Sequence, residues 1–172
     1  MGLNPLLVGL VGLVFVTPVH AQQWAEFHPP DAKYSVETPG EWTMTVNEVS
    51  TDVGSVKAHM ATVTLGDRAY MTMYSAYPPE KVRGKAVTPI LDGARDGAVG
   101  NVEGGKLRKE ERLLISNLPA RQIIVDTPSL MIVARMFMLD VFLIQALVAG
   151  PNGIDSEPTT MRFLNSLKVR YE

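Results

Sequence analysis

The side chains that most often carry catalysis or hold a metal ion are sparse and scattered in this chain. Beyond the first 21 residues its histidines are His28 and His59, which stand far apart in the sequence. A histidine-based zinc or catalytic site usually needs a cluster or a motif such as His-Glu-x-x-His, and the sequence has neither. We therefore interpret both histidines as surface or partly buried residues.

Nucleophilic hydrolysis is poorly supported as well. The chain has no cysteine, which excludes thiol catalysis, cysteine-based zinc sites and a disulfide framework. The Gly-x-Ser-x-Gly and Ser-x-x-Lys motifs of serine hydrolases are missing from the sequence. We expect no catalytic, cofactor-binding or metal-binding residue and no cofactor, and we expect that the protein is not an enzyme.

Two acidic groups are better explained by structure than by ion binding. Asp92 and Asp96 lie four positions apart on an expected helix, whereas calcium loops place oxygens at alternate positions of a non-helical loop. Residues 150–153 precede a helix N-terminus, where phosphates can bind, but Asp155 and Glu157 would repel an anion there. The first pair is interpreted as like charges on a solvent-exposed side, and the segment as a turn with a helix cap.

The nine methionines of the chain raise the alternative of a copper site. Thioethers are soft ligands that suit Cu(I) in an exported protein. Met71 and Met73 share one strand face, and so do Met136 and Met138. The same faces carry the expected core, and methionine commonly fills gaps in cores, so core packing is the favoured interpretation.

Basic residues gather in two stretches that flank the expected middle helix. A formal net charge of −2 argues against general nucleic-acid binding, which needs a concentrated basic surface. Basic residues at sheet edges also discourage aggregation, which favours solvated edges over a docking surface for an acidic partner or lipid headgroups. The two stretches comprise Lys81, Arg83 and Lys85, then Lys106, Arg108, Lys109 and Arg112.

The first 21 residues have the pattern of an export signal. An apolar run over residues 6–16 is broken by Thr17 and Pro18, and small residues follow up to Ala21. The run is too short for a helix across a membrane, which needs about 20 residues. We expect cleavage after Ala21, a single mature domain over residues 22–172, and a periplasmic or secreted location. Because residues 2–5 carry no Lys or Arg, an uncleaved N-terminal anchor is the alternative.

The chain that follows alternates between strand patterns and turn residues, with two helical stretches. Residues 141–148 are almost continuously apolar, and Tyr70 and Tyr74 oppose Met71 and Met73 across one strand, so both strands need cover on both faces. Short turns imply antiparallel neighbours. The strands are expected at 24–27, 34–37, 42–49, 55–64, 69–77, 106–116, 122–125, 131–139 and 142–149, with a short closing strand at 168–171.

Helix and turn signals complete this expectation. Thr88 is expected to cap a middle helix that ends near Gly100, after a polar connection at residues 80–85. Residues 117–120 are expected to form a turn, and Asp155 or Ser156 is expected to cap a last helix. The apolar stripes of the two helices are Ile90, Leu91, Ala94 and Ala98, then Met161, Leu164 and Leu167. The predicted fold class is α+β: an antiparallel sheet of about six to eight strands flanked by helices, an α/β/α sandwich.

Several blocks resemble the PsbP-like family: residues 24–42, 91–98, 149–151 and 162–169. The resemblance implies an α/β/α sandwich. Plant and cyanobacterial members are extrinsic accessory subunits of photosystem II, fold relatives bind a small GTPase, and none is an established enzyme. The chain departs from the family at Ala120, where a glycine often stands, and at residues 138–141, which lack the usual hairpin glycine. No functional residue of the photosynthetic members has a motif match here.

The function expected from these observations is an exported non-catalytic binding or accessory module with a protein partner in the cell envelope. Two alternatives stay open. One is a carrier of a small apolar ligand, with Tyr, Trp and Met side chains lining a cavity between sheet and helix. The other is an enzyme with an unrecognised polar site, which would need a pocket of converging acids or bases.

Overall fold

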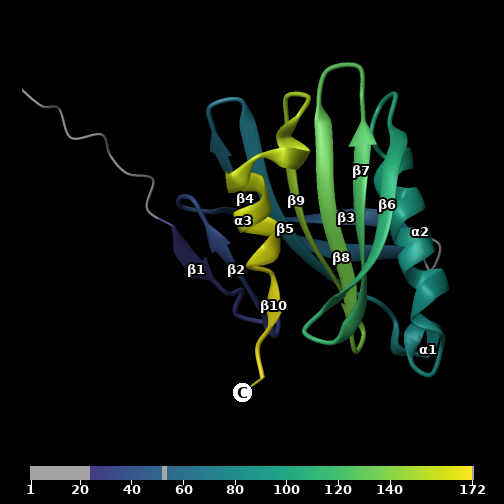
Figure 1. Ribbon diagram of the computed structural model, residues 1–172. Coiled ribbons are helices and arrows are strands. Elements are labelled where there is room, and N and C mark those ends of the chain that lie inside the picture. Colours follow the sequence, from purple (N-terminus) through teal and green to yellow (C-terminus); the bar gives the residue numbers. More distant parts are fainter. Residues whose placement is uncertain (1–23, 52–53, 172) are drawn as a thin grey trace, which may run out of the picture.

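The computed structural model describes residues 24–51 and 54–171, and a seven-stranded antiparallel sheet forms its centre (Figure 1). The strand order is β3-β4-β5-β9-β8-β7-β6. These strands are β3 (Thr43–Thr51), β4 (Gly54–Leu65), β5 (Arg68–Ala76), β6 (Lys106–Ile115), β7 (Leu118–Asp126), β8 (Met131–Leu139) and β9 (Phe142–Gly150). The apolar run of the sequence forms β9, the middle strand. The predicted export signal at residues 1–21 lies outside the described residues.

A small second sheet and helix α3 (Pro158–Asn165) cover one face of the large sheet (Figure 1). Strands β1 (Ala25–Phe27), β2 (Tyr34–Thr38) and β10 (Lys168–Val169) form this sheet in the order β1-β2-β10. The core on this face is aromatic, with Tyr34, Phe137 and Phe163 fully buried. The α+β sandwich predicted from the sequence is confirmed, although the second sheet was not expected.

The opposite face carries helices α1 (Pro79–Val82) and α2 (Val87–Gly100). Helix α2 contacts β7 and β8, and its Leu91 is buried with Ile90, Ala94 and Ala98 packed alongside, as the helical spacing predicts. The hairpin of β3 and β4 crosses behind the middle of the sheet toward α2 in Figure 1, and β3 contacts this helix. Helix α2 and the hairpin therefore lie on the same face.

Two hairpin turns contain two residues each, and the first of them is tighter than the sequence suggested. Residues 117–120 were expected to form a turn, but Leu118 already pairs with Ile115, and the turn is Ser116 and Asn117 alone. Both have positive φ angles, 48° and 66°, which short polar residues tolerate and which a two-residue hairpin turn requires. Asp140, with φ of 52°, replaces the missing glycine at the turn between β8 and β9 in the same way.

Both long helices begin differently from the prediction. Helix α2 begins at Val87 with Ala86 at the N-cap and no side-chain cap, so Thr88 is not a cap and lies inside the first turn. The first four N–H groups of a helix lack internal partners, so Pro89 fits as its third residue. The connection at residues 80–85 was expected only to be polar, and it overlaps α1, which begins at Pro79.

The start of α3 was also misplaced. A short 3₁₀ turn, η1 (Ile154–Ser156), uses the two residues that were expected to cap the helix, and the N-cap is Glu157. The apolar side of α3 is therefore rotated. Its buried residues are Thr160, Phe163 and Leu164, whereas Met161 is partly exposed. In the described part of the chain, no helix is long and apolar enough to span a membrane.

Candidate binding site

A cleft of about 560 Å³ lies between α2 and the face of the large sheet that this helix covers. The sheet supplies the floor, α2 supplies one wall, and the end of β3 supplies part of the rim. Its lining residues are Val49, Ser50, Thr51, Met60, Met73, Tyr77, Pro89, Ile90, Gly93, Ala94, Gly97, Ala98, Asn101, Val102, Ile123, Val125, Ile132, Ala134, Leu143, Gln145 and Leu147. None of these described residues carries a formal charge.

The cleft exists because α2 faces the sheet with small side chains. Gly93, Ala94, Gly97 and Ala98 all line it, and residues at this spacing lie on one side of a helix. A Cβ atom built at Gly97 would meet no atom within 4 Å. Side chains of ordinary core size would fill the space between helix and sheet, so the glycines and alanines leave it open.

The floor is crossed by a row of side chains on four neighbouring strands. In the strand register Met60 pairs with Met73, Met73 pairs with Gln145, and Gln145 pairs with Met136. Met60, Met73 and Gln145 line the cleft, while Met136 is fully buried beside it. Methionine is flexible and polarisable, and it is frequent on surfaces that adapt to different apolar ligands.

Gln145 is the polar residue of this floor. It lies on β9, the middle strand, with methionines on both sides in the register. Its main-chain carbonyl accepts a hydrogen bond from the Thr72 hydroxyl at 3.0 Å. Its side-chain amide has no hydrogen-bond partner among the described residues, although an amide has two donor hydrogens and an acceptor oxygen to satisfy.

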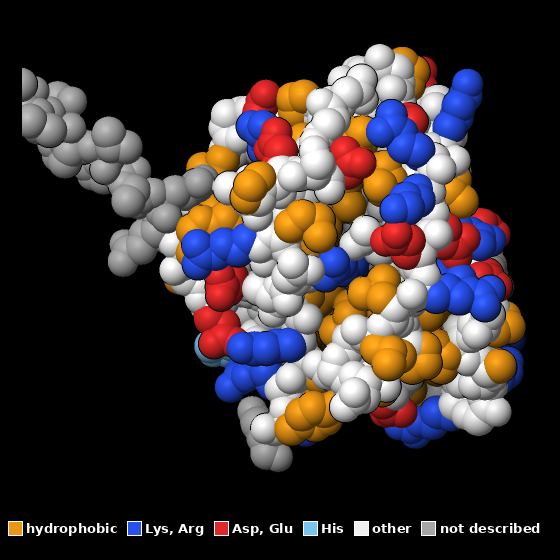
Figure 2. All heavy atoms as spheres, in the orientation of Figure 1, with side chains coloured by type: hydrophobic (Ala, Val, Ile, Leu, Met, Phe, Trp, Pro, Cys, Tyr) orange, Lys and Arg blue, Asp and Glu red, His pale blue; other side chains and the backbone are white. Residues whose placement is uncertain are grey.

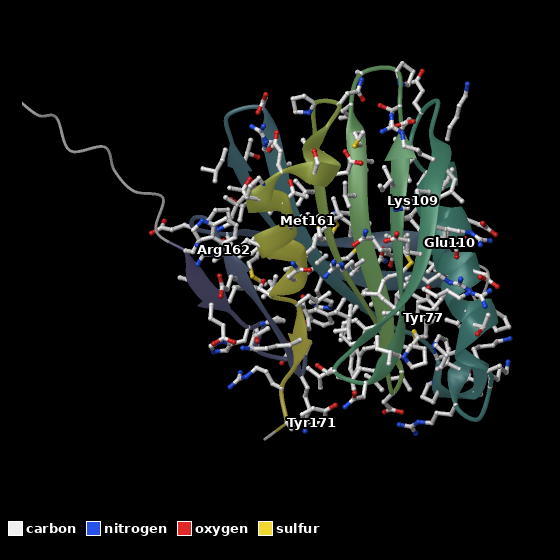
Figure 3. The ribbon with its side chains drawn as sticks, in the orientation of Figure 1. Tyr77, Lys109, Glu110, Met161, Arg162 and Tyr171 are labelled. Carbon is white, nitrogen blue, oxygen red and sulfur yellow. The ribbon has the colours of Figure 1, made fainter. Side chains whose placement is uncertain are left out.

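Helix α2 is fixed to the edge of the sheet by a group of ion pairs on its other side. Arg121 of β7 is only 4% exposed and contacts Asp92 of α2 and Glu110 of β6. Arg95 of α2 contacts the same Glu110 at 2.8 Å and Asp96 at 2.8 Å. Glu110 points from β6 toward α2 (Figure 3). Hydrogen bonds from Arg95 to Asp96 and Glu110 raise the pKa of the Arg95 guanidinium, which stays charged.

Comparison with known proteins identifies the fold. No protein-family model matches the chain, and no curated relative matches it. The solution structure of cyanobacterial PsbP (CyanoP) from Synechocystis sp. PCC 6803 is similar, with a TM-score of 0.58 and 13% identity over 91% of this chain and 98% of that chain. The chain has a PsbP-like fold. A crystal structure of a Pseudomonas aeruginosa protein of unknown function, PA94, a putative regulator, gives a TM-score of 0.39 with 10% identity over 80% of this chain and 85% of that chain.

Within this PsbP-like fold the two candidate histidines lie apart. His28 is exposed after β1, while His59 on β4 stacks on Tyr74 with ring centroids 4.7 Å apart. No group of three His, Cys, Asp or Glu residues that could hold a metal ion occurs in the described part of the chain. Met136 and Met138 are buried in the core on the α2 face, as their spacing indicated.

The acidic residues considered for ion binding contact cations of the protein itself. Asp92 and Asp96 form the ion pairs with Arg121 and Arg95 already described, so they do more than share a solvent-exposed side. At the start of α3, Glu157 accepts two hydrogen bonds from Arg68, at 2.8 and 2.6 Å. This neighbourhood of the Gly150 turn therefore holds an internal ion pair.

Several of the basic residues also face carboxylates. Figure 2 shows Lys and Arg side chains interleaved with Asp and Glu on the side of the molecule that carries β6 and α2. The nearest pairs in the two basic stretches are Arg83 with Asp140 at 3.0 Å, Arg108 with Asp126 at 2.8 Å and Lys109 with Glu111 at 2.6 Å. This arrangement is typical of a solvated edge with both signs of charge.

A second hollow, about 380 Å³, differs from the cleft because its lining is charged. Arg162 of α3 reaches over the Trp24 ring, 4.4 Å from its centroid, and donates a 2.7 Å hydrogen bond to Glu37 of β2 (Figure 3). Lys168 contacts Glu26 at 3.1 Å in the same hollow. These cations and carboxylates neutralise one another across the small sheet.

Sequence reasoning found part of the cleft. The stripe of Ile90, Ala94 and Ala98 was predicted, and Tyr77 and Met73 do line a space between sheet and helix. The tryptophans expected there are elsewhere, because Trp24 and Trp42 pack against the aromatic core on the opposite face. Gln145 was missed because it appeared as one polar residue in an apolar run. This polar residue within the apolar run was the sequence signal that could have identified Gln145 as a candidate.

Proposed function

We propose that the chain is a non-catalytic binding module that holds a small apolar molecule in the cleft between α2 and the sheet. The observation that carries this proposal is a cavity of about 560 Å³ whose described lining residues are all uncharged. Small-molecule sites are typically concave and largely apolar, have a few polar groups, and occupy roughly 300–1,000 Å³. The cleft matches each of these features.

The chemistry of the described residues supports a role without catalysis. An enzyme site needs acids, bases or nucleophiles within hydrogen-bond reach of a reacting group. The described lining has neither carboxylates nor histidines, and His28 and His59 contribute nothing to it. A binding role needs only the apolar walls and the polar groups of the floor and rim.

We further propose that the protein works outside the cytosol. This part of the proposal rests on residues 1–21, whose apolar run and small residues before position 22 have the pattern of an export signal. N-terminal sequencing of protein recovered from the envelope fraction of its host tests it. A mature chain that begins at Gln22 is expected, and an intact leader on a cytosolic pool would contradict it.

Filling the cleft from α2 tests the binding role. N-phenyl-1-naphthylamine, an uncharged dye that fluoresces in apolar surroundings, serves as the probe. Gly97→Leu adds a side chain on the helix side that lines the cleft, where a Cβ has open space, so dye affinity should fall by about tenfold or more. Gly97→Ala is the control, because it raises helix propensity by about 1 kcal/mol with little added volume.

A third variant separates filling from disturbance of the helix. Gly100→Leu also adds a side chain where a Cβ meets nothing, but Gly100 does not line the cleft. It should leave dye binding unchanged. Equal binding by wild type and Gly97→Leu would overturn the proposal. Native mass spectrometry of protein purified from its own host provides an independent test, because a carrier should retain a small molecule.

A second candidate function, docking of a protein partner in the cell envelope, is favoured by strand β3. This edge strand has Glu48 as its one charged residue, and Met44 and Val46 keep about half of their surface exposed. The other edge strand, β6, carries six charged residues and a bulge after Leu107. Charges and bulges protect sheet edges from pairing, so β3 is the edge open to an added strand.

Matched substitutions on the two edges test this candidate. Val46→Lys places a charge on β3, and Leu114→Lys places one on β6 at a residue that is also exposed. A partner that adds a strand to β3 should co-purify from the envelope fraction with wild type and Leu114→Lys and be lost with Val46→Lys. A partner retained by Val46→Lys would not dock at β3.

A further inference from the structure

The charge and hydrogen-bonding groups of the cleft restrict what can occupy it. We propose that its ligand is an uncharged apolar molecule with one hydrogen-bonding group, an alcohol or a carbonyl, and that the Gln145 amide binds that group. This inference rests on the proposed function and names the ligand class for the same site. It begins with the absence of charge among the described lining residues.

An anionic ligand such as a fatty acid would lack a counter-ion in this cleft. Moving a charge from water into apolar surroundings is costly unless an opposite charge or several hydrogen bonds compensate it. Arg121 follows Met136 in the same row of the sheet register, but it does not line the cleft. Its two terminal nitrogens already contact Asp92 and Glu110, so binding an anion there would break existing ion pairs.

An uncharged polar group meets a suitable partner on the floor. The Gln145 side chain offers donor hydrogens and an acceptor oxygen and has no partner among the described residues. The register places Met73 and Met136 on its two sides, so competing polar side chains do not flank it along this row. Gln145 is partly buried, so a ligand that displaces water from the cleft must satisfy its amide, and a ligand hydroxyl or carbonyl would do so.

The position of Gln145 also orients the ligand. The residue lies on the middle strand, in the floor of the cleft that Gly93 and Gly97 of α2 also line. The hydrogen-bonding group of the ligand therefore points to the floor, and its apolar remainder lies against the methionines and the small residues of the helix. Discrimination against a molecule that lacks the polar group follows, because the amide would then stay unpaired.

Competition between two matched probes tests the inference. 1-Decanol and decanoate have the same chain length and differ in the charge of the head group at pH 8. Each is titrated against the purified protein with N-phenyl-1-naphthylamine bound. Decanol should displace the dye at a concentration about tenfold or more below that of decanoate. In Gln145→Leu, decanol should lose about tenfold in affinity, while the dye should bind as well as before.

Asn165→Ala is the control, because Asn165 is an exposed amide on α3, which covers the opposite face of the sheet, and it does not line the cleft. It should leave the preference for decanol intact. Decanoate binding as tightly as decanol would overturn the uncharged ligand while leaving the binding role in place. Unchanged decanol affinity in Gln145→Leu would overturn the role of Gln145. If wild type binds neither the dye nor decanol, the proposed function fails, and this inference fails with it.

Discussion

The Tyr34 hydroxyl is a buried titratable group whose environment makes stability depend on pH. Tyr34 is 1% exposed, and its hydroxyl lies 2.9 Å from the hydroxyl of Thr72. Burial raises the pKa of the Tyr34 phenol above its ordinary value. Since the folded pKa exceeds the unfolded one, Tyr34 stabilises the fold fully below about pH 10 and loses this contribution as pH rises further.

Tyr34→Phe should therefore change both the size and the pH dependence of the free energy of unfolding. At pH 7 the variant should lose about 1 kcal/mol, because one buried hydrogen bond is gone. Between pH 10 and 11 wild type should lose about 1 kcal/mol that the variant keeps. Urea unfolding over this range measures both effects. Tyr171→Phe, at an exposed tyrosine, is the control, and parallel alkaline slopes for wild type and Tyr34→Phe would contradict the prediction.

Thr160, unlike Tyr34, has a buried hydroxyl that no hydrogen bond within the described part of the chain stabilises. Its side chain projects from α3 and is fully buried, and its hydroxyl has no hydrogen-bond partner among the described residues. Thr160→Val keeps the shape and removes the unpaired hydroxyl, so it should raise the free energy of unfolding by about 1 kcal/mol. Thr88→Val, at an exposed threonine of α2, should change it by less than about 0.5 kcal/mol. Destabilisation by Thr160→Val would indicate a hydrogen bond to bound water.

Helix α2 forms ion pairs with the sheet on one side and borders the cleft on the other. Asp92 and Arg95 face the ion pairs with β6 and β7, while Ala94 and Gly97 face the cleft. We therefore expect the ion pairs to set the distance of the helix from the sheet. Without them the apolar side of α2 would be free to move closer to the floor and reduce the cleft.

Arg121→Met tests whether these ion pairs hold α2. Removing the buried cation leaves Asp92 and Glu110 with Arg95 as their remaining partner, so the free energy of unfolding should fall by about 2–3 kcal/mol. The expected loss is smaller than for a fully buried ion pair because both carboxylates are partly exposed. Adding Asp92→Asn and Glu110→Gln to Arg121→Met should recover about 1 kcal/mol or more, measured by urea unfolding. Arg121→Met as stable as wild type would mean that packing alone positions the helix.

The sequence predicted those elements whose signals are local. Alternation in the two strands beside Gly66 gave the correct hairpin, with Tyr70 and Tyr74 facing away from Met73. The second sheet was missed because it joins residues 25–38 to residues 168–169, and strand alternation does not say which distant segments pair. The helix starts were misplaced because neither α2 nor α3 has a side-chain cap, the signal used to find them.

The candidate site depended on distances that no local pattern contains. Ala94 and Ala98 were correctly predicted to face the sheet, but whether small residues pack closely or leave a cleft depends on how far away α2 is held. The ion pairs expected to set that distance involve Arg121 and Glu110, which lie on other elements. Gln145 likewise became a candidate only when the register placed methionines on both sides of it.

In the whole molecule, the two faces of the large sheet are packed differently. On the face covered by α3 and the small sheet, large aromatic residues fill the space, and Tyr34, Phe137 and Phe163 are completely buried. On the face covered by α2, side chains border a cleft of about 560 Å³. Stability should therefore come mainly from the first face, and the second should tolerate changes that alter binding.

Two residues of the middle strand allow this division to be measured on one element. Ile144 faces the aromatic core and is fully buried, whereas Leu147 lines the cleft and is partly exposed. Ile144→Ala should lower the free energy of unfolding by about 3–4 kcal/mol, because it opens a cavity in a filled core. Leu147→Ala should cost about 1–2 kcal/mol, since its side chain already borders open space and loses less buried area. Guanidinium unfolding of both variants gives the comparison, and equal losses would mean that the cleft closes in solution and that both faces are packed alike.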